Sequence, residues 1–192
     1  MNEKKEMEEE ARVVGTLPAG VRIRDLACLT HDRGSLTEIY RQDWWPYGPA
    51  RQWNLVTSPA GVLRGIHVHT NGSEYYALVS GRALVGYQDL RPGSPTLGQA
   101  ALVEVGGAGP VAIVAPPGLA HGVYGLEAFT LLVGTTAMWD PTSELGCHWK
   151  DPGLEIPWPF ETAVVSSHDA SLGRLRDLLS SALKYDAAGR QG

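Results

Sequence analysis

Apolar residues recur at every second position, or in short runs, in many brief segments of the chain. Such segments are typical of β-strands. The predicted strands are 21–29, 35–41, 51–58, 61–69, 75–81, 82–90, 99–105, 110–116, 121–126 and 129–138. Turn sequences such as VSGR, RPGSPT and GGAG separate them at short intervals. Many short strands with frequent turns indicate an all-β sandwich or closed barrel.

A helical pattern replaces the alternating one from Ser171 onward. One stripe with helical spacing is formed by Leu172, Leu175, Leu178, Leu179, Ala182 and Leu183. The sequence therefore predicts an all-β body with a C-terminal α-helix. Neither an internal repeat nor a linker divides the chain. We expect a mobile charged leader at 1–12, one domain at 13–186 and a loose tail at 187–192.

One long loop, RQDWWPYGPA at 41–50, interrupts the strand pattern and is rich in aromatic residues. A loop of this composition is compatible with a hydrophobic plug over the core, a subunit interface or a lid. The plug is the simplest expectation, and the other two stay open.

Composition narrows the functional classes. A chain of 192 residues is long enough for one sizeable core, and no apolar run approaches the ~20 residues that span a bilayer. The charged start MNEKKEMEEEAR is not a signal peptide, and Cys28 and Cys147 make no disulfide framework, so a reducing cytoplasm is expected. A net charge of −5 without a basic run argues against nucleic acid and anionic membranes as partners.

Ligand-type side chains gather in the stretch GIHVHTNGSEYYALVSG at 65–81. His67 and His69 are two apart on a predicted strand and so point to one face, and a turn at TNGS would return Glu74 toward them. The later APPGLAHG supplies His121. Imidazoles with one carboxylate suit a divalent ion such as Mn, Fe, Ni or Zn, and the spacing resembles the cupin signature. The alternative is that the histidines are polar pocket residues and Glu74 lies on the surface.

A second resemblance covers the chain from about Asp25 to Asp169. The ordered blocks HDRGSLTEIYR, GVLRGIH, DLRPGSPTLG, PPGLAHG and WKDPGLEIPWPF are similar to those of the dTDP-4-dehydrorhamnose 3,5-epimerase (RmlC) family. The resemblance implies a cupin-type β-barrel (jelly roll) and a dimer that exchanges an N-terminal segment. It also implies deoxysugar biosynthesis, with metal-free action on nucleotide-linked 4-keto-6-deoxy sugars.

The family's chemistry assigns roles to two residues. A C–H next to a ketone loses its proton only if the site holds a base, a stabiliser for the enolate oxygen and an acid on the opposite face. The resemblance implies that His67 is the base and that Asp169 orients it, because a carboxylate on the distal nitrogen fixes the imidazole tautomer. Asp169 also precedes the predicted helix, so simple helix capping is the alternative.

Substrate-binding residues follow from the same resemblance. Arg33 and Arg64 match arginines that hold a diphosphate, a task that suits a planar guanidinium. Further expected contacts to the substrate are Glu38, Gln52, Asn54, His121 and Trp139. For Trp139, base stacking competes with the expectation of a core tryptophan.

Three positions depart from the family pattern. Glu74 stands where the family has a lysine near the ketone, Val133 where it has the acidic tyrosine, and His69 where a glutamine is common. A valine cannot donate a proton. Two alternatives therefore accompany the epimerase: a metal-dependent cupin isomerase or oxygenase with His67, His69, Glu74 and His121 as ligands, and a sugar-nucleotide-binding relative without chemistry.

Overall fold

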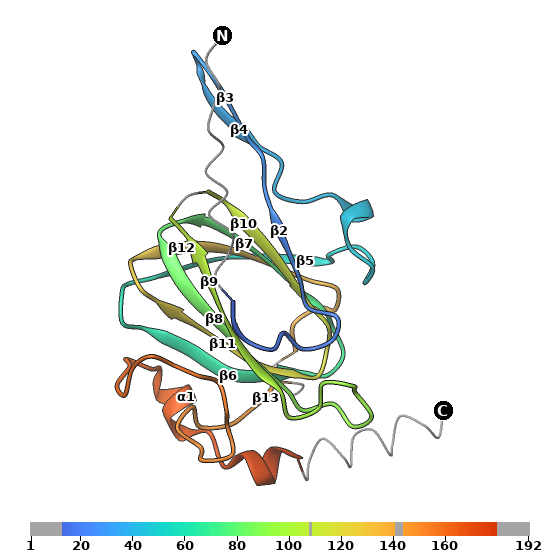
Figure 1. Ribbon diagram of the computed structural model, residues 1–192, viewed down its shortest axis with the longest axis vertical. Helices are drawn as coiled ribbons and strands as arrows, with labels where there is room; N and C mark the ends of the chain where they lie inside the picture. The colour runs from blue at the N-terminus through green and yellow to red at the C-terminus, as the bar shows by residue number, and fades with distance from the viewer. Residues whose placement is uncertain (1–12, 108, 141–143, 180–192) are drawn as a thin grey trace.

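Two antiparallel β-sheets form the body of the protein in a computed structural model that describes residues 13–107, 109–140 and 144–179 (Figure 1). The larger sheet has the order β1 (Val13–Gly15), β9 (Ala100–Gly106), β8 (Arg82–Asp89), β11 (Leu119–Gly125), β6 (Leu63–His69) and β13 (Glu144–Gly146). The smaller has the order β2 (Arg22–Asp25), β10 (Val111–Ala115), β7 (Glu74–Ser80), β12 (Phe129–Thr135) and β5 (Gln52–Ser58).

The main core lies between the sheets. On β8, Val85 and Tyr87 face this core, whereas Leu84 faces outward. Gly86 also faces outward, where an added Cβ would lie 2.6 Å from the Trp158 ring, so only glycine admits the C-terminal segment at this distance. The core residues are Tyr76, Leu78, Ala83, Val85, Tyr87, Val103, Val105, Val111, Ile113, Ala115, Leu119, Val123, Phe129 and Leu131.

Two segments cover the outer faces of the barrel. The segment after β13 packs over the six-stranded sheet, below β6 in Figure 1, with Trp149, Ile156 and Leu175 buried against it. The aromatic loop, with a 3₁₀ turn η1 (Gln42–Trp44), covers the five-stranded sheet, where Trp45 is 8% exposed and packs on Tyr75 with ring centroids 5.1 Å apart. The expectation of a hydrophobic plug is confirmed for Trp45.

The predicted strands all overlap observed ones, with three differences. The predicted strand 21–29 is broken into β2 and β3 (Cys28–His31), because Leu26 is buried under the aromatic loop and its amide donates to Pro110 O at 3.0 Å. The strand predicted at 35–41 is β4 (Gly34–Thr37) and ends at Thr37. The three-residue strands β1 and β13 were not predicted, since they are too short to show alternation.

A hairpin of β3 and β4 stands away from the barrel, at the top of Figure 1. Leu29 and Leu36 pair across it and are 55% and 57% exposed. Two large apolar side chains on an exposed two-stranded hairpin are a common mark of a contact surface, since such a hairpin is marginally stable alone.

The C-terminal helix differs from the prediction. A short helix α1 (Ser167–Ser171) comes first, and residues 175–179 are helical after a break at 172–174. The break is stabilised from outside, because Gly173 O accepts from His148 N at 2.9 Å and Leu175 N donates to Asp151 Oδ2 at 3.2 Å. Ala182, Leu183, the leader 1–12 and the tail 187–192 lie outside the described residues. No helix among the described residues is long and apolar enough to cross a membrane.

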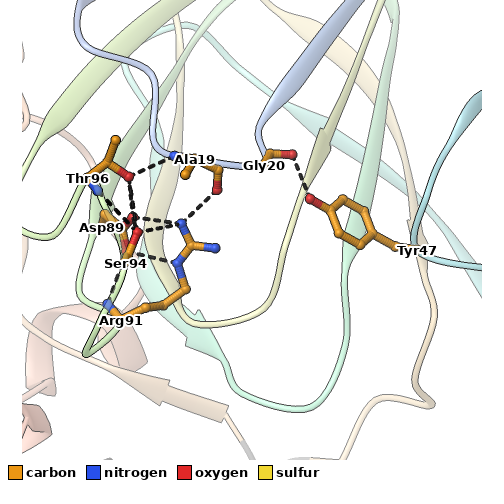
Figure 2. A network of polar contacts seen from close by, with 7 residues as sticks. All are labelled: Ala19, Gly20, Tyr47, Asp89, Arg91, Ser94 and Thr96. Atoms are coloured by element: carbon orange, nitrogen blue, oxygen red, sulfur yellow. Dashed lines mark hydrogen bonds and ion pairs between the residues drawn. The ribbon is translucent and has the colours of Figure 1, made fainter.

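A buried carboxylate fixes the loop after β8 (Figure 2). Asp89 Oδ1 accepts from Arg91 Nε at 2.8 Å, and Asp89 Oδ2 accepts from the hydroxyls of Ser94 and Thr96, each at 2.6 Å. Arg91 Nη2 also donates to Ala19 O at 2.7 Å. Burial would raise the pKa of Asp89, but these hydrogen bonds hold it well below its ordinary range. The network joins the 90–99 loop to the segment before β2.

We expect Asp89→Asn to lower the free energy of unfolding at pH 7 by about 3 kcal/mol, because the change removes the charge that the buried Arg91 contact requires. Since the folded-state pKa of Asp89 is depressed, its contribution is present above the unfolded pKa and is lost as the pH falls. Urea unfolding should therefore show the gap to wild type closing below about pH 4.

The exposed Asp43, which pairs with Arg41 at 3.2 Å, provides the matched control. Asp43→Asn should leave the unfolding midpoint unchanged within error. A gap between wild type and Asp89→Asn that stays constant down to pH 2 would contradict the role assigned to the Asp89 charge.

Candidate active site

An irregular pairing of β6 with β11 turns His67 toward the barrel interior. Gly65 and His67 pair with consecutive residues of β11, so Ile66 is an extra residue. Leu63, Ile66 and Val68 all pack in the cluster on the outer face. These residues are three and then two positions apart, whereas side chains on one face of a regular strand are an even number of positions apart. The bulge therefore changes which face each side chain takes, and His67 lies on the inner one.

Glycine is required next to this bulge. Gly65 has φ +125°, and an added Cβ would lie 2.7 Å from the carbonyl oxygen of His121. The amide of Gly65 points instead toward the C-terminal segment, where it donates to Asp169 Oδ2 at 3.5 Å. The motif LRGIH thus carries its glycine for backbone geometry.

His67 and Asp169 form a hydrogen-bonded pair. His67 Nε2 lies 2.8 Å from Asp169 Oδ1, and the two side chains are 22% and 7% exposed. Burial would raise the pKa of Asp169, but the hydrogen bonds from His67, from Ser166 and from the Gly65 amide hold it below its ordinary value. Because Asp169 is ionised, Nε2 carries the proton and donates it.

The helix-capping alternative for Asp169 is wrong. Ser166 is the N-cap of α1, and its hydroxyl accepts from Asp169 N at 3.0 Å. The carboxylate of Asp169 faces β6 rather than its own helix. The short helix thus positions Asp169 toward His67.

An open pocket lies against His67. Trp139, which is 55% exposed, lies at this pocket, so the expectation of a core tryptophan is wrong. Its amide donates to Gln52 Oε1 at 2.9 Å, and Gln52 Nε2 donates to Asn54 Oδ1 at 3.1 Å. The lining residues are Asn54, His67, His69, Asn71, Gly72, Glu74, Val133, Thr135, Ala137, Met138, Trp139 and Asp140. Gln52, Asn54 and Trp139 thus lie together at the pocket, and their contact with a substrate stays a prediction.

Three of the four predicted metal ligands converge beside the pair. His69 Nε2 lies 3.5 Å from Glu74 Oε1, and His121 Nε2 lies 3.0 Å from Glu74 Oε2. Glu74 is 8% exposed, so the expectation that it lies on the surface is wrong. His67 is not among the side chains whose ligand atoms converge, and it contacts Asp169 instead.

Tyr76 belongs to this cluster and was not predicted. Its hydroxyl donates to Glu74 Oε2 at 2.6 Å. Burial raises the pKa of Glu74, but His121, His69 and the Tyr76 hydroxyl together lower it to about 2. The signal was present in the sequence, because Tyr76 follows Glu74 by two residues on a strand and so shares its face.

Arg64 lies on β6 in reach of solvent. Its Nε donates to Ser58 Oγ at 2.7 Å and its Nη2 donates to Thr57 O at 3.1 Å. These bonds use one edge of the guanidinium and fix its position three residues before His67. Such a placed, exposed guanidinium is suited to a phosphate group.

Arg33 and Glu38 are not brought to the pocket within one chain. Arg33 lies in the turn of the β3–β4 hairpin, which stands away from the barrel (Figure 1). Glu38 is exposed after β4 and lies 4.0 Å from Arg41. Their predicted substrate contacts therefore need a second chain.

The pocket wall opposite the histidines holds no hydroxyl at the position of the family's tyrosine. Val133 lines the pocket there, paired with Tyr76 across β12 and β7. The Tyr124 ring on β11 stacks on Phe160, with ring centroids 3.8 Å apart, on the outer side of the sheet. Tyr124 is therefore excluded as a donor into the pocket.

Comparison with known proteins gives relatives along most of the chain. The sequence pattern that defines the dTDP-4-dehydrorhamnose 3,5-epimerase family matches residues 16–177. The dTDP-4-dehydrorhamnose 3,5-epimerase of Neisseria gonorrhoeae is 30% identical over 162 residues, which are 81% of this chain and 49% of that protein. The chain thus spans about half the length of that relative.

Solved structures of relatives superpose on the barrel. The RmlC epimerase of Mycobacterium tuberculosis gives a TM-score of 0.81 at 28% identity, over 91% of this chain and 92% of that chain. A 3'-monoepimerase from Streptomyces bikiniensis, in complex with dTDP-quinovose, gives 0.77 at 26% identity, over 91% and 94%. The chain therefore belongs to the dTDP-4-dehydrorhamnose 3,5-epimerase family, and its barrel is the cupin-type jelly roll that the resemblance implied.

Proposed function

We propose that the protein is a cytoplasmic isomerase that inverts a carbon next to the ketone of a dTDP-linked 4-keto-6-deoxy sugar. The observation that carries the proposal is the His67–Asp169 hydrogen bond of 2.8 Å at an open pocket. Support for the substrate class comes from the relatives, since the related S. bikiniensis enzyme holds dTDP-quinovose. The same relatives, named as epimerases, do not favour the metal-dependent isomerase or oxygenase.

The pair performs proton abstraction as follows. Because Asp169 accepts from Nε2, the neutral imidazole of His67 carries its lone pair on Nδ1. That nitrogen takes the proton from the carbon next to the ketone, and the electron pair of the C–H bond moves into the enolate. The imidazolium that forms is stabilised by the Asp169 carboxylate, which keeps its negative charge.

Inversion needs a proton from the other face, and Val133 cannot supply one. Solvent that enters the open pocket is the remaining donor in this proposal. Removal of the proton is then faster than its stereospecific return. We therefore expect exchange of substrate hydrogen to outpace inversion, with inversion slow, partial or confined to one centre.

Exchange with solvent tests this function directly. In D₂O, dTDP-4-keto-6-deoxyglucose should take up deuterium at C3 or C5, detected by NMR. His67→Ala should abolish the exchange, and Asp169→Asn should lower its rate by about 10³-fold, because the amide no longer fixes the tautomer. Both variants should still bind dTDP.

His148→Gln is the control, since His148 follows β13 and does not line the pocket. Its exchange rate should stay within about two-fold of wild type. Wild-type protein that binds the sugar nucleotide but exchanges no deuterium, with or without added divalent ions, would favour the non-catalytic binding relative.

We further propose that the active unit is a homodimer in which the β3–β4 hairpin of one chain reaches the pocket of the other. The exposed Leu29 and Leu36 provide apolar area for that contact. Arg33 at the hairpin turn would then join Arg64 at the diphosphate. Two guanidinium groups would offset the two negative charges of the diphosphate.

Subunit mixing distinguishes this arrangement from a monomer. Arg33→Ala and His67→Ala should each be inactive at low substrate concentration. After unfolding and refolding together in equal amounts, they should recover about a quarter of wild-type activity, because half of the dimers are mixed and each has one intact pocket. Static light scattering that shows a monomer at micromolar concentration, or mixing without recovery, would contradict the exchanged hairpin.

A further inference from the structure

We propose that His69, Glu74 and His121 bind one divalent transition-metal ion, separately from the His67–Asp169 pair. The three residues come from three strands, β6, β7 and β11. Each offers one ligand atom, and these atoms lie within 4.8 Å of one another. Two imidazole nitrogens and a carboxylate form a donor set that suits Mn, Fe, Ni or Zn.

The contacts of His121 favour a bound cation. Its Nδ1 lies 3.2 Å from the carbonyl oxygen of Leu119, and its Nε2 lies 3.0 Å from Glu74 Oε2. Both nitrogens thus face oxygen acceptors, and a neutral imidazole has only one N–H. The same Glu74 oxygen already accepts the hydroxyl of Tyr76. A cation between the ring and the carboxylate would relieve this excess of acceptor atoms.

A metal ion satisfies every one of these contacts. The N–H on Nδ1 of His121 then donates to the Leu119 carbonyl, and the Nε2 lone pair and the Glu74 carboxylate both point to the ion. A ligating histidine that donates its other N–H to a backbone carbonyl is the usual arrangement in metal sites. Tyr76 holds the carboxylate in place through the bond of 2.6 Å.

The location leaves the ion accessible from the pocket. Glu74 and His121 are buried, whereas the His69 side chain is 22% exposed, and both His69 and Glu74 line the pocket. His67 is not among the residues whose ligand atoms converge. A base and a cation can therefore occupy one pocket through different residues. The inference concerns binding and stands whether or not the chain epimerises a sugar.

The test measures metal directly. Protein purified without a polyhistidine tag and loaded separately with Mn²⁺, Fe²⁺, Ni²⁺ and Zn²⁺ should retain about one ion per chain after gel filtration, determined by mass spectrometry. His69→Gln and Glu74→Gln should each weaken binding by at least about 100-fold in calorimetric titration. The Co²⁺-loaded wild type should show d–d absorption that both variants lose.

The control is His67→Asn, which removes a neighbouring imidazole outside the cluster and should keep the ion and the Co²⁺ spectrum. Circular dichroism checks that each variant is folded. The proposal would be overturned if both cluster variants retained stoichiometric metal, if His67→Asn lost it, or if wild type bound none of these ions. Deuterium exchange is measured apart from these assays, so loss of either activity is recognised by itself.

Discussion

The bulge at Ile66 is the constraint on which the site depends, because it sets the face of every later residue on β6. With regular pairing, the outward positions of Leu63 and Val68 would be incompatible, since they are five residues apart. The extra residue shifts the alternation of faces by one position, so that the Leu63 and Val68 side chains both pack under the C-terminal segment. The same packing brings α1 onto β6, which places Asp169 against His67. One irregular residue thus links the packing of the outer core to the position of the His67–Asp169 pair.

Two carboxylates near the pocket are kept ionised by different means. Asp169 accepts hydrogen bonds from one imidazole, a backbone amide and the serine hydroxyl at its helix start. Glu74 lies between two imidazoles and a phenol, and its electrostatic interactions and hydrogen bonds with these groups outweigh the cost of its burial. The carboxylate brings the ring nitrogens of His69 and His121 together at the pocket.

The sequence predicted the all-β barrel because alternation survives in strands of five residues or more, and it failed where elements are shorter or interrupted. The strands β1 and β13 have three residues each, and the break at Leu26 depends on a contact with Pro110 that no local pattern shows. His67 was predicted from its motif. The alternatives of helix capping for Asp169 and of a surface position for Glu74 were wrong. The surroundings of each carboxylate depend on residues distant in sequence, and only tertiary packing brings these together.

The helix prediction failed for a related reason. Leu175 and Leu178 are buried as the apolar stripe implied, but the chain between them and α1 is held open by Asp151. Helix propensity describes a segment in isolation. In the folded protein the first helix ends early, and its Asp169 contacts β6. A local rule is thus broken where the site needs a particular side chain, which is where such exceptions are expected.

The charge of the pocket bears on the proposed binding of a sugar nucleotide by two chains. The described residues that line it include two carboxylates, Glu74 and Asp140, and neither Lys nor Arg. A diphosphate entering such a pocket is repelled unless cations are added from its margins. Arg64 lies beside His67 on the same strand, and the hairpin carries Arg33 far from its own barrel. In the proposed dimer, the Arg33 guanidinium of the second chain would offset the negative charge of this lining, and so would a cation bound at the proposed metal site.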